Sequence, residues 1–113
     1  MNYYNLFVHL FHIIIVGSLF LYVGINRDSS SKYIFDLLLV LGVIILLYHI
    51  YKTYIKLIKN INPWVNLFHI FIVSPIVIYI GYNGKETKRL YFELLLMLAF
   101  AAIGYHLYYI FYN

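Results

Sequence analysis

Residues 8–16 read VHLFHIIIV, and residues 65–73 read VNLFHIFIV, which lie 57 positions further along the chain. Seven of these nine positions are identical, and one of the identical residues is a histidine inside an otherwise apolar run. Apolar composition alone matches leucines and isoleucines by chance, but it does not place a histidine at the same point twice. The two stretches therefore indicate that the chain contains an internal repeat.

The same shift of 57 residues aligns residues 5–56 with residues 62–113 without a gap, and 19 of these 52 positions are identical. The matches include the pattern Tyr-x-Gly-x-Asn at residues 22–26 and 79–83. We therefore interpret the chain as a single membrane domain, residues 1–113, made of two copies of one unit. The first copy spans residues 5–56 and the second spans residues 62–113.

The composition of the chain favours a membrane over water as its solvent. Of 113 residues, 65% are hydrophobic and only 11% are charged, whereas soluble domains carry about 25% charged residues. Each copy contains two long apolar runs, and we expect helices near residues 6–25, 33–56, 63–82 and 89–112. The first run has twenty residues and is about 30 Å long as a helix, which is one hydrocarbon thickness. The sequence thus predicts an all-α fold, a bundle of four transmembrane helices built from two parallel-repeated helical hairpins.

The basic residues lie in or beside the three connections and predict both partner and topology. A basic fringe of this kind meets lipid phosphates, so the lipid bilayer is the expected partner and nucleic acid is not. Five bases lie in the hairpin turns, residues 26–32 and 83–89, against three beside the middle connection. The positive-inside rule therefore predicts that the hairpin turns are cytosolic. The chain has no cysteine, which excludes disulfides and thiol catalysis.

Four histidines recur at matched positions, one in each expected helix. His12 lies 12 residues before Gly24, and His49 lies 13 residues after Asp36 on the following antiparallel helix. Both are therefore roughly 18–20 Å from the hairpin turn. The repeat places His69 and His106 at the same height, so the sequence predicts a layer of four histidines. Depth alone does not decide whether their rings face one another.

The histidine layer has two interpretations. Ionisable groups inside a membrane often mark ion paths or cofactor sites, and four imidazoles could relay protons, hold a metal ion or ligate haem. The other interpretation is that each histidine hydrogen-bonds a carbonyl or a tyrosine on a neighbouring helix, and we favour it because such contacts are common. His9 is replaced by Asn66 in the second copy. We therefore place His9 outside the symmetric layer and expect its substitution to be nearly silent.

Asp36 and Glu93 occupy matched positions near the start of the second and fourth helices. As carboxylates in the first turn they suit the helix dipole, and each can pair with the base four residues earlier, Lys32 or Arg89. The alternative interpretation is a mouth for cations opposite the histidines. Asp36 and His49 are about 140° apart around one helix, so the helix cannot aim both at one axis, which favours the first interpretation.

Small residues and a proline predict details of helix contact. Gly42 matches Ala99, which indicates a close approach between helices of one chain or of two protomers. Pro75 interrupts the hydrogen-bond ladder of the third helix, where the first copy has Ser18, so a kink is expected there.

The second hairpin also resembles known proteins. Residues 81–85 read GYNGK, residues 92–96 read FELLL and residues 104–109 read GYHLYY. This segment resembles small uncharacterised membrane proteins of large DNA viruses. The resemblance implies a virion or host membrane location and carries no catalytic residue to this chain.

Three readings of function remain open at this point. The first is a structural or interaction protein of a membrane, with a homo-oligomer or another membrane protein as partner. The second is an oligomeric channel or proton-conducting protein that uses the histidine layer. The third is a haem or metal carrier. No catalytic motif appears, so the sequence predicts no enzyme, and we assign no cofactor.

Overall fold

The computed structural model describes residues 2–112, and among these residues it is helical almost throughout, with no strand. Four helices within residues 2–112 are long and apolar enough to cross a membrane, and they indicate an integral membrane location. They span Tyr3–Ser29, Lys32–Ile58, Trp64–Glu86 and Arg89–Phe111. The all-helical prediction is confirmed, and each end of a helix lies within four residues of the expected position.

The first and third helices are composite, and the second and fourth are uninterrupted. The first consists of α1, a π-helical segment, α2 and a 3₁₀ turn: Tyr3–Leu10, Phe11–Val16, Gly17–Asn26 and Arg27–Ser29. The third has the same order, with α4, a π-helical segment, α5 and a 3₁₀ turn: Trp64–Phe68, His69–Val73, Ser74–Asn83 and Gly84–Glu86. The others are α3, Lys32–Ile58, and α6, Arg89–Phe111.

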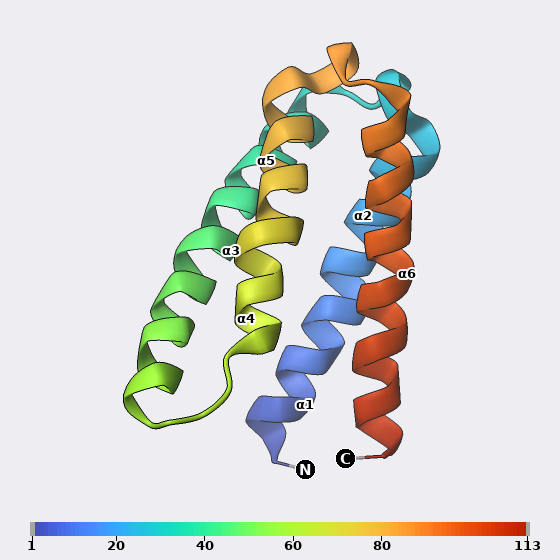
Figure 1. The fold of residues 1–113 in the computed structure, drawn as a ribbon. Helices are drawn as coiled ribbons and strands as arrows, with labels where there is room; N and C mark the ends of the chain where they lie inside the picture. Colours follow the sequence, from blue (N-terminus) through green and yellow to red (C-terminus); the bar gives the residue numbers. More distant parts are fainter. Residues whose placement is uncertain (1, 113) are drawn as a thin grey trace. The chain divides into compact units, whose positions relative to one another are not determined.

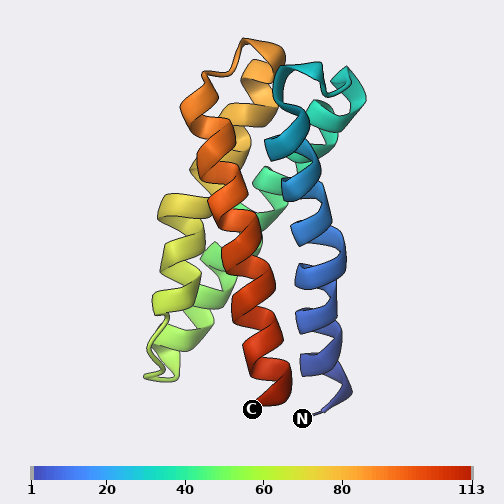
Figure 2. The same ribbon diagram turned by 90° about the vertical axis from the view of Figure 1, so that its right-hand side faces the viewer.

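The described residues form two compact units, each a pair of antiparallel helices. One unit joins residues 2–29 to residues 88–112, so α1 and α2 lie along α6. The other contains residues 30–87, where α4 and α5 lie along α3 (Figures 1 and 2). Each unit therefore combines the first helix of one copy with the second helix of the other. We call them the terminal pair and the central pair.

The terminal pair is held by large apolar side chains and by one close glycine contact. Phe20 and Val23 of α2, together with Phe92 and Leu95 of α6, are almost completely buried. A Cβ atom on Gly24 would lie 2.6 Å from the Cγ atom of Leu96, so only glycine permits this approach.

The central pair repeats this arrangement at the matched positions. Val77 and Ile80 of α5 and Leu38 of α3 are fully buried. A Cβ atom on Gly81 would lie 2.5 Å from the backbone nitrogen of Leu39, which is an even closer approach of two backbones. Gly42 lies against Val77 and Ile78 of α5, so the close approach predicted at this residue is to a helix of the same chain.

The π-helical segment of the third helix does not depend on the proline that follows it. The N–H of Ser74 donates to the carbonyl of His69, five residues earlier, just before Pro75. The N–H of Gly17 donates in the same way to His12 in the first helix, where the next residue is Ser18. The departure from α-helical geometry is therefore common to both copies, and Pro75 is accommodated at its edge.

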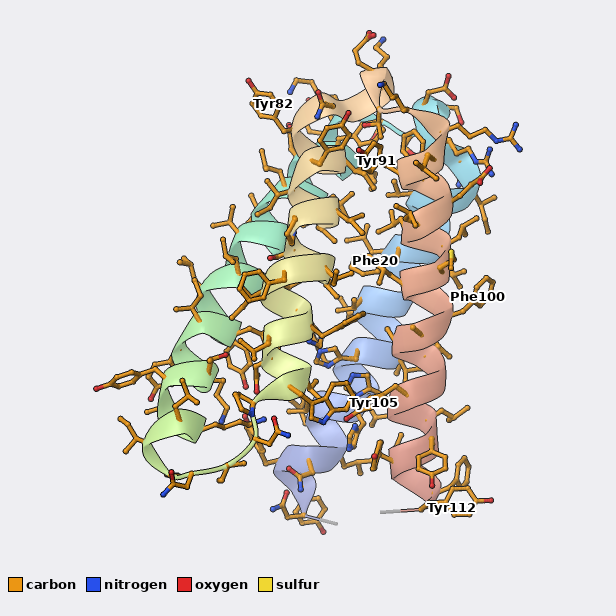
Figure 3. The ribbon with its side chains drawn as sticks, viewed as in Figure 1. Phe20, Tyr82, Tyr91, Phe100, Tyr105 and Tyr112 are labelled. Atoms are coloured by element: carbon orange, nitrogen blue, oxygen red, sulfur yellow. The ribbon has the colours of Figure 1, made fainter. Side chains whose placement is uncertain are left out.

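Apolar and aromatic side chains cover the outer surfaces of the helices. Phe100 is 64% exposed and points away from α2 (Figure 3). Tyr82 lies in the last turn of α5, while Tyr91 and Tyr112 lie at the two ends of α6. Tyrosines at helix ends suit the level of the lipid headgroups, and exposed apolar side chains between them suit the hydrocarbon.

Candidate functional site

His12 of the terminal pair and His69 of the central pair lie in the two π-helical segments. The Nδ1 atom of His12 lies 2.7 Å from the carbonyl oxygen of Val8, and that of His69 lies 2.7 Å from the carbonyl oxygen of Val65. Because a carbonyl oxygen only accepts, each imidazole donates through Nδ1. Both rings are thus held against their own helix with the proton on Nδ1.

Each of these rings stacks on the histidine of the partner helix. The ring centroids of His12 and His106 are 4.1 Å apart with an interplanar angle of 21°. Those of His49 and His69 are 4.0 Å apart with an angle of 12°. The rings therefore make contact within each pair, which equal depth does not by itself require.

A third side chain in each pair holds the partner-helix histidine. The Nδ1 atoms of His9 and His106 are 2.9 Å apart in the terminal pair. In the central pair, Nδ2 of Asn66 lies 2.8 Å from Nδ1 of His49. His9 and Asn66 occupy matched positions in the repeat, and each contacts the Nδ1 atom of a matched histidine.

The expectation that His9 lies outside the layer is therefore wrong. In the alignment of the two copies, the change from His9 to Asn66 reads as the loss of an imidazole. Both side chains can donate a hydrogen bond at similar reach, so the hydrogen bond is retained while the residue type changes. The signal was present in the repeat, because a polar residue stands at this position in both otherwise apolar runs.

The two pairs differ in how their protons are fixed. An amide nitrogen only donates, so Nδ1 of His49 accepts from Asn66 and the neutral ring carries its proton on Nε2. The hydrogen bond between His9 and His106 can run in either direction, because each Nδ1 atom can donate or accept. The central pair has one proton arrangement, and the terminal pair has two.

Tyrosines border both histidine pairs through ring contacts. Tyr48 and Tyr105 stand edge-on to the adjacent rings of His49 and His106, with centroids 5.1 and 5.2 Å apart. Tyr109 lies parallel to His9 at 6.5 Å. These rings surround the imidazoles with aromatic faces and edges.

The two carboxylates are surface residues paired along their own helices. Nζ of Lys32 lies 3.3 Å from Asp36, and Nε of Arg89 lies 2.8 Å from Glu93. Both carboxylates are about half exposed, and each makes the ion pair that the first interpretation allowed. Their assignment to the first turn is wrong: α3 and α6 begin at Lys32 and Arg89, so each carboxylate is the fifth residue of its helix. The ion pair with the preceding base, rather than the helix terminus, therefore accounts for them.

Among residues 2–112, no group of three or more histidine, aspartate or glutamate side chains is arranged to hold a metal ion. No protein-family model, curated protein or solved structure matches the chain. An account of function therefore starts from the two histidine pairs.

Proposed function

We propose that this chain is a duplicated structural or interaction protein of a membrane, and that hydrogen bonds of its histidines hold helices together. We call the contact of His9 with His106 and the contact of Asn66 with His49 the two clasps. One observation carries the proposal: Nδ1 of every repeated histidine is engaged inside its own helix pair. Two of these atoms meet a carbonyl oxygen, one meets His9 and one meets Asn66. The two carbonyl contacts lie within one helix, whereas the contacts of His9 with His106 and of Asn66 with His49 join two helices. These two contacts are directional in a way that apolar contacts between helices are not, so they fix which helix faces are joined.

The outer faces of the helices support a role in interaction. Large side chains such as Phe71, Met97 and Phe100 are more than 60% exposed along the middle of their helices. These faces meet lipid tails, or the helices of a second copy or of another membrane protein. On this proposal the chain is not an enzyme and needs no cofactor. A virion or host membrane is the location that the viral resemblance supports.

The alternative function is proton conduction through the histidines. It draws support from the π-helical segments beside His12 and His69, since such segments frequently occur at functional sites. Haem binding by the same residues is the third candidate, and an absorbance spectrum of the purified chain tests it directly.

A proton-flux assay in liposomes separates the first two candidates. The full chain is compared with His12→Ala, His49→Ala, His69→Ala and His106→Ala. The clasp predicts that proton flux equals that of empty liposomes for every protein, while each substitution lowers thermal stability. Flux above empty liposomes that disappears in the four variants would contradict the proposal and establish conduction.

A further inference from the structure

Three lysines lie on one side of α3 where that helix ends in the central pair. Lys52, Lys56 and Lys59 are spaced by four and then three residues, so their side chains share one side of the helix. Lys52 and Lys56 are partly exposed, and Lys59 is exposed. We call these three residues the lysine face.

The positive charge of the lysine face is not compensated by the chain. All four acids of the sequence lie in the hairpin turns or four residues after them. The nearest acid on α3 is Asp36, which lies 16 residues before Lys52, about 24 Å away along the helix. Five bases against these four acids leave a net charge of +1 around the hairpin turns, while the lysine face carries +3.

The length of α3 places the lysine face at the level of the lipid headgroups. Its 27 residues span about 40 Å, which exceeds the hydrocarbon thickness of about 30 Å. Lys32 opens the helix and Lys52 follows 20 residues later, about one hydrocarbon thickness away. The last two turns of α3 therefore extend beyond the hydrocarbon. Tyr54 and Trp64, both more than half exposed, suit the same level.

The helix dipole does not account for all three lysines. A base in the last turn of a helix is favoured by the free carbonyl groups there, which suits Lys56 and Lys59. Lys52 lies six residues before α3 ends, outside the last turn to which this effect is confined. The matched helix α6 has no base in its last turn, and the residue matched to Lys52 is Tyr109. The repeated architecture therefore does not require a positive helix end.

We infer that the lysine face binds the headgroups of acidic phospholipids in preference to those of zwitterionic ones. An acidic headgroup offers a net negative charge, whereas a zwitterionic headgroup carries a cation of its own beside the phosphate. The long lysine side chains can lie along the apolar helix surface and extend their ammonium groups to the phosphates. The inference rests on the membrane role proposed above and adds a lipid class and one end of the central pair to it.

The single tryptophan reports which lipid lies at this end of the central pair. Trp64 begins α4, directly after the connection that follows the lysine face. The full chain is reconstituted in vesicles with equal amounts of phosphatidylcholine and phosphatidylglycerol in both leaflets, so its orientation does not affect the result. Bromine on the acyl chains of one lipid at a time quenches tryptophan on contact. Brominated phosphatidylglycerol should associate about fivefold more strongly at low salt, and about 0.5 M salt should remove this preference.

Two variants of equal charge locate the preference. Replacing the lysine face (Lys52→Gln, Lys56→Gln and Lys59→Gln) should make both lipids quench Trp64 equally. The control replaces the three hairpin-turn bases that make no ion pair among the described residues (Arg27→Gln, Lys85→Gln and Lys88→Gln) and should keep the preference.

The possible outcomes separate this inference from the proposed function. Equal quenching by both lipids in the original chain, or the same loss of preference in both variants, would overturn the inference and leave the proposed function standing. Equal quenching in the original chain would instead favour an acidic protein segment as the occupant of the lysine face. Quenching by neither lipid would contradict the membrane location on which both proposals rest.

Discussion

At the scale of single residues, the main result is that different side chains do the same work at matched positions. His9 and Asn66 both hold the Nδ1 atom of a histidine on the partner helix. Arg27 and Gly84 likewise share one backbone conformation, with φ of 53° and 57°. In the first case both residue types fulfil the role. In the second the arginine occupies a conformation that suits only glycine.

Removing either holding residue should weaken the helix pair to which it belongs. Asn66→Ala removes the amide that donates to Nδ1 of His49, and His9→Ala removes the imidazole that shares a hydrogen bond with Nδ1 of His106. Each should lower the free energy of unfolding in mild detergent by about 1 kcal/mol. Ile14→Ala, at an exposed apolar position, is the control for loss of side-chain volume. If His9→Ala is as mild as this control, the original expectation of a silent substitution is right and the clasp at His9 contributes nothing.

Relieving the strained residue should stabilise the chain. Arg27 has φ 53° and ψ −126°, outside the regions that residues with a Cβ atom adopt readily. Arg27→Gly should raise the free energy of unfolding by about 1 kcal/mol, less the loss of the hydrogen bond from Nε to the Gly24 carbonyl. Gly84→Ala at the matched position should lower it. Thermal unfolding of the two variants tests both signs, and a destabilised Arg27→Gly would show that the backbone there is not strained.

At the scale of elements, the helices were predictable and their departures from α-helical geometry were not. Runs of twenty or more apolar residues bounded by polar turns leave little choice in a membrane, since only a helix satisfies its own backbone there. The π-helical segments were not predicted, because no residue type in the sequence indicates a backbone hydrogen bond of five-residue spacing. Pro75 predicted an irregularity at the position where the π-helical segment of the third helix ends. The first helix has the same segment without a proline, so the proline is not its cause.

Close helix contact at the element scale can be tested with two glycines. Gly81→Ala places a methyl group against the backbone of Leu39, which cannot move without shifting α3. It should cost about 1–3 kcal/mol of unfolding free energy. Gly104→Ala meets nothing within 4 Å and should be neutral or stabilising by up to about 1 kcal/mol, because alanine favours helix. Equal effects of the two substitutions in thermal unfolding would contradict this contact.

At the scale of the whole molecule, the sequence predicted four long apolar helices, which the described residues contain, and one common depth for His12, His49, His69 and His106, which stays a prediction. It could do so because depth follows from counting residues from a turn. The choice of partner helix depends on side-chain shape across a contact, which a periodic apolar pattern does not encode. His12 therefore had a predictable level but no predictable neighbour, and its stack on His106 emerged only from the fold.

The central claim is that two matched clasps, His9 with His106 and Asn66 with His49, hold the two helix pairs. Solid-state nuclear magnetic resonance of the full chain in lipid bilayers tests it most directly, with ¹⁵N-labelled histidine and asparagine. The account predicts ¹⁵N–¹⁵N correlations between the side chains of both pairs, at neutral pH. Asn66→Ala should remove only the correlation to His49, and His9→Ala only the correlation to His106. Correlations that join His9 to His49 instead, or none between these side chains, would contradict the account.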